Sequence, residues 1–104
     1  YNMDKYHMFF SKLANKLKMS IIWELNKKPC SVLELADKLN VEQSKLSHAL
    51  ISLKCCSIVE VKQAGKKRIY SLNKETIVPI LKIIDEHENK FCVECKAMNN
   101  SLGK

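Results

Sequence analysis

Residues 39–59, LNVEQSKLSHALISLKCCSIV, decide the fold of this chain. Their pattern predicts the end of one short helix, a tight turn and a second helix over residues 42–55. The apolar residues of the second helix recur at the spacing that places them on one side, namely Leu46, Ala49, Leu50 and Leu53. The other side carries hydrogen-bonding groups, namely Gln43, Ser44, Ser47 and His48. Such groups can read base edges in a DNA major groove, so we interpret this segment as a recognition helix.

The helix before the turn begins with a capping box. Ser31 and Glu34 stand three residues apart, so each side chain can satisfy a free backbone N–H group of the first turn. The buried side of this helix is expected to contain Leu33, Leu35, Ala36 and Leu39. Asn40 suits the left-handed residue that often ends a helix.

The flanking segments predict further helices and a hairpin. Residues 4–18 and 19–27 carry helical apolar stripes. Residues 58–63 and 67–72 are β-branched and alternating on either side of a glycine turn, which indicates a β-hairpin. A last helix is expected over residues 75–89, where Pro79 is tolerable near the first turn.

This order of elements, α-α-α-α-β-β-α, is that of a mainly α winged helix-turn-helix. We expect one domain over residues 1–96, with terminal helices that dimerise, and a polar, frayed tail over residues 97–104.

The charge of the chain favours a polyanionic partner. It has 104 residues with 18 Lys plus Arg against 11 Asp plus Glu, a formal net charge of +7 and a pI of about 9.2. No apolar run approaches the roughly 18 residues of a membrane-spanning helix. The five cysteines are an odd number without a secretion pattern, so we expect reduced thiols and a cytoplasmic protein.

Three segments resemble those of the ArsR-type repressors. Residues 13–25, LANKLKMSIIWEL, resemble that family's LADPTRLRILELL, and residues 39–59 resemble its LGLSQSTVSHHLKVLREAGLV. Residues 60–72, EVKQAGKKRIYSL, resemble its wing, RSRREGRWVYYRL. The resemblance implies a homodimeric repressor that binds a palindromic operator and often responds to a metal. The chain departs from the family pattern at three positions, where Lys16, Glu42 and Ser57 replace a Pro, a capping Ser and a Gly.

The family's usual metal ligands are missing. The positions of its Cys-x-Cys motif are occupied by Ser31 and Leu33, and Cys30 lies one residue too early. The Asp and His that follow the family's wing correspond to Asn73 and Glu75.

A different metal site is suggested by His87, Cys92 and Cys95. Two thiolates spaced Cys-x-x-Cys can converge on one tetrahedral ion, and thiolates with imidazole suit zinc. A fourth ligand could come from Cys55, Cys56 or a second subunit. In the alternative interpretation, Cys92 and Cys95 are small apolar residues of a dimer core and His87 is a surface residue. Cys55 and Cys56 are expected to pack toward the core.

Two further sets of residues follow from this interpretation. DNA contacts are expected from Gln43, Ser44, Lys45, Ser47 and His48 in the major groove, from Lys62, Lys66, Lys67 and Arg68 on the hairpin, and from Lys16 and Lys18 at the junction of the first two helices. Dimer contacts are expected from Tyr6, Phe9, Phe10, Leu13, Ile77, Ile80, Leu81 and Ile84. Trp23 is expected in the core or the dimer interface, together with the two phenylalanines.

We therefore expect a sequence-specific regulator of transcription that binds double-stranded DNA, in the form of a homodimeric repressor that responds to metal or thiol state. The alternative is a winged helix module that binds proteins in a transcription or recombination assembly. An enzyme is not expected, because no Ser/His/Asp grouping, carboxylate pair or phosphate-binding glycine loop is present.

Overall fold

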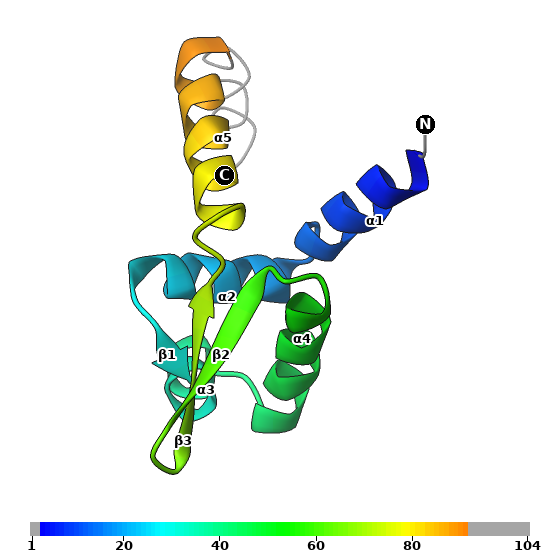
Figure 1. Cartoon of the computed structure of the whole chain (residues 1–104). Coiled ribbons are helices and arrows are strands. Elements are labelled where there is room, and N and C mark those ends of the chain that lie inside the picture. The colour runs from blue at the N-terminus through cyan, green and yellow to red at the C-terminus, as the bar shows by residue number, and fades with distance from the viewer. Residues whose placement is uncertain (1–2, 92–104) are drawn as a thin grey trace. The chain divides into compact units, whose positions relative to one another are not determined.

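The computed structural model describes residues 3–91 and divides into two units, the first ending at Asn73 and the second beginning at Lys74. The first unit contains α1 (Met3–Leu13), α2 (Lys16–Lys27), β1 (Cys30–Ser31), α3 (Val32–Leu39), α4 (Gln43–Cys55), β2 (Val59–Ala64) and β3 (Lys67–Leu72) (Figure 1). The second contains α5 (Ile77–Phe91). The winged helix-turn-helix predicted from the sequence is confirmed, with α3 and α4 as the helix pair and β2 and β3 as the wing.

The core of the first unit lies where α2, α3 and α4 meet the sheet. Leu46, Ala49, Leu50 and Leu53 of α4 are all buried, as the apolar spacing predicted. They share this core with Ile21, Ile22 and Leu25 of α2, Leu35 of α3, and Val59, Tyr70 and Leu72 of the wing. Truncation of a buried leucine to alanine typically lowers the free energy of unfolding by about 2–5 kcal/mol, so the buried side of α4 anchors the helix firmly in the core.

The boundary between the first two helices lies closer to the N-terminus than predicted. A helix over residues 4–18 was expected, but α1 ends at Leu13 and α2 begins at Lys16. The physical reason is Asn15, whose Oδ1 accepts a hydrogen bond from the Lys18 backbone N–H at 3.0 Å. Asparagine is among the best N-cap residues, whereas apolar periodicity continues across such a break and does not reveal it.

The capping box of α3 is confirmed. The Ser31 backbone N–H donates to Glu34 Oε1 at 2.9 Å, and the Glu34 N–H donates to Ser31 Oγ at 3.2 Å. Asn40 ends the helix at φ 55°, in the left-handed region as predicted. The prediction for Leu33 is wrong, since this side chain is 63% exposed. Two residues span about 200° of a helix, so Leu33 faces away from the buried Leu35.

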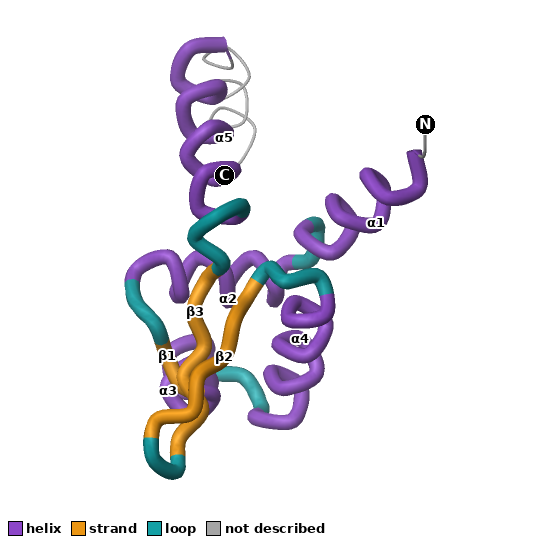
Figure 2. Tube along the Cα trace, in the orientation of Figure 1, coloured by secondary structure: helices purple, strands orange, loops and turns teal. Residues whose placement is uncertain are grey.

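The sheet has one more strand than the sequence predicted. The strand order is β1-β3-β2, and the two-residue β1 pairs antiparallel with β3 through Cys30↔Tyr70 and Ser31↔Ile69 (Figure 2). So short a strand has no recognisable period. The predicted hairpin is confirmed, with a two-residue turn in which Gly65 has φ +65°. A first turn residue at positive φ favours glycine, because it has no Cβ.

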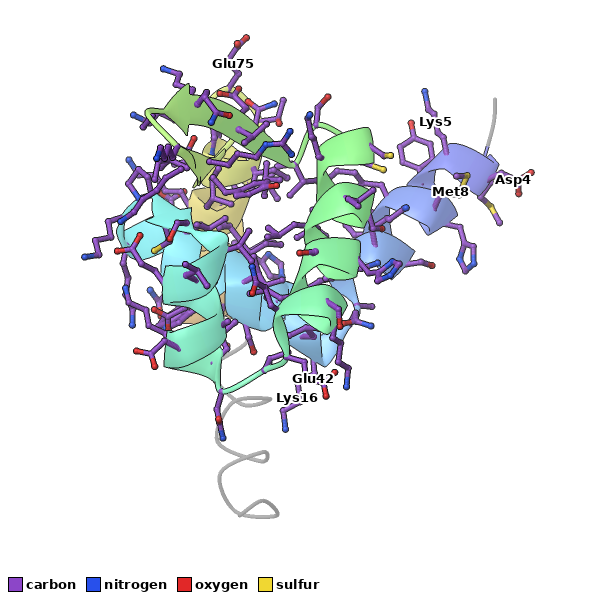
Figure 3. The ribbon with its side chains drawn as sticks, turned by 90° about the horizontal axis from the view of Figure 1, so that it is seen from below. Asp4, Lys5, Met8, Lys16, Glu42 and Glu75 are labelled. Carbon is purple, nitrogen blue, oxygen red and sulfur yellow. The ribbon has the colours of Figure 1, made fainter. Side chains whose placement is uncertain are left out.

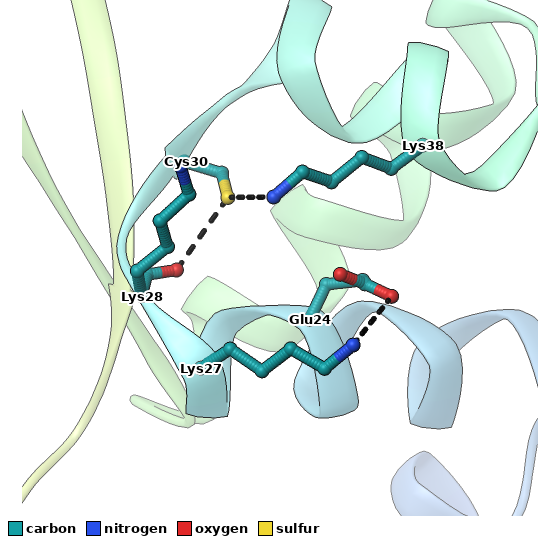
Figure 4. Close-up of polar contacts among 5 residues, drawn as sticks. All are labelled: Glu24, Lys27, Lys28, Cys30 and Lys38. Atoms are coloured by element: carbon teal, nitrogen blue, oxygen red, sulfur yellow. Dashed lines mark hydrogen bonds and ion pairs between the residues drawn. The ribbon is translucent and has the colours of Figure 1, made fainter.

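Cys30 is fully buried where β1 meets α3. Its thiol donates to the Lys28 carbonyl oxygen at 3.5 Å, and its sulfur accepts from Lys38 Nζ at 3.8 Å (Figure 4). The ion pair between Lys27 and Glu24, at 3.6 Å, lies within α2. Cys30 is therefore a packed residue that joins β1 to α3.

The second unit consists of the helix α5 in its described part. The helix begins two residues later than predicted, and Pro79 lies in its first turn. No helix in residues 3–91 has the length and apolar character to cross a membrane.

Candidate nucleic-acid interface

The helix α4 presents its polar side to solvent. Gln43, Ser44, Lys45 and His48 are exposed and Ser47 is half-buried, while the apolar side holds the helix in the core. Glu42 at the N-cap makes no side-chain cap bond. The hydrogen-bonding groups predicted to read bases thus share one accessible surface on the first two turns of α4.

The C-terminal end of α4 is closed by a Schellman motif. The Ile58 N–H donates to the Leu53 carbonyl at 3.0 Å, and the Ser57 N–H donates to the Lys54 carbonyl at 2.9 Å. Ser57 takes the left-handed position at φ 57°, where glycine is the usual residue. Cys55 and Cys56, beside this motif, are exposed, so the prediction that they face the core is wrong.

The wing carries its cations on both faces. Lys62, Lys66, Lys67 and Arg68 are all exposed. Lys62 pairs with Ile69 and Lys67 pairs with Ala64, which places the two lysines on the same face of the hairpin, because side chains alternate along a strand. Arg68 pairs with Gln63 on the opposite face, and Lys66 lies in the turn. The tip of the wing can therefore present positive charge to phosphates on either side.

The lysines of α2 lie in two different settings. Lys16 is exposed and extends outward from the ribbon in Figure 3. Lys18 is half-buried and donates from Nζ to Ser52 Oγ on α4 at 3.0 Å. Lys12, in the last turn of α1, donates to the same oxygen at 2.9 Å. Neither Lys12 nor Ser52 could be predicted as part of a site, because neither residue belongs to a pattern in the sequence.

The apolar residues of α1 are exposed or half-buried in the part of the chain that the structure describes. Tyr6 is 48% and Phe10 57% exposed, and Phe9 and Leu13 are half-buried. Trp23 of α2 is 64% exposed, so it is not a core residue.

In α5, Ile84 is exposed, and Ile80 and Leu81 are half-buried. Ile77 is buried within the chain, and its side chain is therefore not free to meet a partner as predicted.

Part of the predicted metal site lies beyond the residues described. His87 is exposed on α5, and its ring centroid lies 5.2 Å from that of Phe91. Cys92 and Cys95 lie outside the described residues. Within residues 3–91, no group of three or more His, Cys, Asp or Glu side chains is placed to hold a metal ion.

The buried side of α4, its polar exposed side and the basic hairpin together define a winged helix-turn-helix. No known protein-family model matches the sequence. The HTH-type transcriptional regulator NmtR of Mycobacterium tuberculosis is 32% identical over 69 residues, which are 66% of this chain and 58% of that protein. The chain thus covers less than two thirds of that relative's length.

Solved structures share the fold over most of the chain. The transcriptional regulator HlyU from Vibrio vulnificus matches with a TM-score of 0.70 and 27% identity, over 82% of this chain and 88% of that one. Mb0332 from Mycobacterium bovis, a homodimeric winged helix-turn-helix domain described as a possible ArsR-family regulator, matches with a TM-score of 0.70 over 86% of this chain and 87% of its own. Its 22% identity supports the fold alone. The chain is therefore similar to transcriptional regulators of the winged helix-turn-helix type, in agreement with the resemblance noted in its sequence.

Proposed function

We propose that this chain is a sequence-specific regulator of transcription that binds double-stranded DNA as a homodimeric repressor. The main support for the proposal is that α4 has two sides of different character. Its apolar side is buried, and its exposed side offers Gln43, Ser44 and His48 to a partner. Amide, hydroxyl and imidazole groups match the donor and acceptor pattern of the major groove. A helix that docks on a protein more often presents apolar or aromatic anchors there.

The wing and α2 supply the sequence-independent part of the interface. Lys62, Lys66, Lys67 and Arg68, with Lys16 on α2, are exposed cations that can contact the phosphate backbone. Each phosphate that a cation neutralises releases counterions, so binding should weaken steeply as salt rises. The net charge of +7 favours the same encounter. As a regulator of transcription, the protein would act in the cytoplasm, where bacterial DNA lies.

The dimer would form through the terminal helices. Tyr6 and Phe10 of α1 are apolar, exposed and close together on one helix, and they can pair across a twofold axis with Phe9 and Leu13. The exposed Ile84 and half-buried Ile80 and Leu81 give α5 an apolar side of its own, which can pair with the same helix of a second subunit. Two copies of α4 would then address half-sites separated by about 34 Å, one turn of DNA. A twofold protein of this kind reads a palindromic site.

We also propose that His87, Cys92 and Cys95 bind a zinc ion, which acts either as an effector or only to stabilise the structure. Imidazole and thiolates are the ligands that zinc prefers, and the three residues follow one another closely in the sequence. If the ion is an effector, chelation should change operator affinity by about 1–3 kcal/mol, as is typical of allosteric coupling. Bound metal measured in the native protein and in Cys92→Ser/Cys95→Ser tests this. Equal metal content in both, or none in the native protein, would remove the site.

Selection from a pool of random duplexes tests the main proposal. We expect one enriched motif, composed of two half-sites related by a twofold axis. A pool that stays random after repeated rounds would contradict direct reading of bases. Retention of every duplex alike would reduce the protein to a non-specific DNA binder.

A further inference from the structure

Two lysines from different helices converge on one hydroxyl group. Lys12 Nζ of α1 and Lys18 Nζ of α2 donate to Ser52 Oγ of α4 at 2.9 Å and 3.0 Å. The two ammonium nitrogens are therefore at most about 6 Å apart, the combined length of two such bonds. In the described part of the chain, neither ammonium has a carboxylate as an ion-pair partner. Two like charges held this close repel each other, and an anion bound between them would offset the repulsion.

The cluster has more hydrogen-bond donors than acceptors. Each ammonium group has three N–H donors, of which one donates to Ser52, so two donors remain on each lysine. The Ser52 hydroxyl oxygen accepts both bonds, and within residues 3–91 no acceptor is found for its own proton. An acceptor with several oxygens would satisfy these donors together.

A hollow in the surface lies beside the cluster. His7, Met8 and Ser11 of α1 line it together with Lys12 and Lys18, and its volume is about 360 Å³. His7 and Ser11 are exposed and add an imidazole and a hydroxyl to the donors around the hollow. A tetrahedral oxyanion is small enough for this space and presents acceptors in several directions.

We propose that Lys12, Lys18 and Ser52 bind a phosphate-like oxyanion at the junction of α1, α2 and α4. The site goes beyond the proposed function, which assigns no role to Lys12 or Ser52. The oxyanion can come from a free phosphate compound or from a phosphodiester of DNA, which have the same chemistry. Its position joins a dimerising helix to the recognition helix, so occupancy stabilises the arrangement of α1 against α4.

A titration of isotope-labelled protein with inorganic phosphate tests the site in the absence of DNA. Phosphate replaces chloride at constant ionic strength, and the backbone amide signals of Lys12, Lys18 and Ser52 are followed. We expect a saturable shift of these signals that weakens at least tenfold in Lys12→Met and in Ser52→Ala. Lys5→Met is the matched control, because Lys5 also lies on α1 but does not line the hollow. Its binding should equal that of the native protein.

Two variants are used so that the test does not depend on the folding of one of them. Ser52→Ala removes only a hydroxyl, so it remains informative if Lys12→Met fails to fold, and an unchanged spectrum elsewhere verifies its fold. A shift that does not saturate, or one that survives in Ser52→Ala, overturns the site. If the selection from random duplexes still yields a motif, the proposed function stands without it.

A second titration, on the protein saturated with duplex DNA, identifies the source of the oxyanion. If a DNA phosphodiester occupies the site, inorganic phosphate no longer shifts the signals, and Lys12→Met lowers the salt dependence of DNA binding by about one counterion. If the ligand is a free phosphate compound, the complex still binds phosphate. Either result supports the site.

Discussion

Asn73, at the end of β3, donates a hydrogen bond from Nδ2 to the Ser57 carbonyl oxygen at 2.8 Å. The Asn73 backbone N–H also donates to the Ile58 carbonyl at 3.0 Å. These two bonds tie the Schellman motif at the end of α4 to the end of the wing. Helix α4 and the wing are thereby held together at Asn73, a position where the family resemblance implied a metal ligand.

The left-handed Ser57 predicts a stabilising substitution. A non-glycine residue at φ 57° carries a steric penalty of about 1–2 kcal/mol, which glycine does not. Ser57→Gly should therefore raise the free energy of unfolding by about 1 kcal/mol, less the entropy that glycine adds to the unfolded chain. Urea denaturation measures this. Ser57→Val should be destabilised in the same assay, and equal stability of all three proteins would contradict the strain.

The capping box of α3 predicts a pH dependence of stability. The hydrogen bond from the Ser31 backbone N–H, followed by the bond with its side chain, lowers the pKa of Glu34 below its ordinary value of 4.5. Since the folded pKa is the lower one, this stabilisation is present above the unfolded pKa and is lost as the pH falls through the folded pKa.

Glu34→Gln isolates this contribution, because glutamine can still reach the Ser31 N–H but carries no charge. The native protein should be the more stable one at neutral pH, and the gap between the two urea midpoints should close as the pH falls below 4.5. A gap that is constant across this range would show that the charge of Glu34 plays no part.

Much of the first unit could be predicted from the sequence, because its elements follow strong local rules. The buried side of α4, the capping box and the glycine turn each depend on residues close together in the chain. The break at Asn15 was missed, because a cap is a single side-chain bond that leaves the apolar period intact. Strand β1 was missed because its two residues pair with a distant strand.

The candidate site could also be predicted only in part. Exposure of Gln43, Ser44 and His48 follows from helical geometry once the buried side is known. The convergence of Lys12 and Lys18 on Ser52 could not be predicted, since it needs the positions of three helices. The exposure of Trp23 could not be predicted either, because residue type alone does not show whether an apolar side chain is buried in the core or exposed on the surface.

A substitution in the wing should weaken all DNA sequences alike. Lys67→Met removes an exposed cation for which we propose a contact with the DNA backbone and not with a base. Affinity for specific and scrambled duplexes should fall by the same factor, and the slope of log K against log salt should decrease by about one. Fluorescence anisotropy at several salt concentrations measures both. A loss confined to the specific duplex would instead make Lys67 a base-reading residue.

A charge on the exposed side of α1 should dissociate the dimer. Phe10 is 57% exposed in the single chain, so Phe10→Glu leaves the core of one subunit intact while placing carboxylates in an apolar interface. Sedimentation velocity at micromolar concentration should find a dimer for the native protein and a monomer for the variant. Lys74→Glu, at an exposed position outside α1 and α5, is the control and should remain dimeric. A monomeric native protein with full DNA affinity would contradict the twofold arrangement.

Base reading by the exposed side of α4 is the central claim, and paired titrations test it most directly. The duplex enriched by selection and a scrambled duplex are each titrated with native protein, Gln43→Ala and Ser47→Ala. Loss of a bidentate contact from Gln43 should cost about 1–3 kcal/mol for the enriched duplex alone, and loss of the single hydroxyl contact of Ser47 should cost less. In both variants the preference should shrink while affinity for the scrambled duplex is unchanged. If both variants keep the full preference of the native protein, α4 is not the element that reads the sequence.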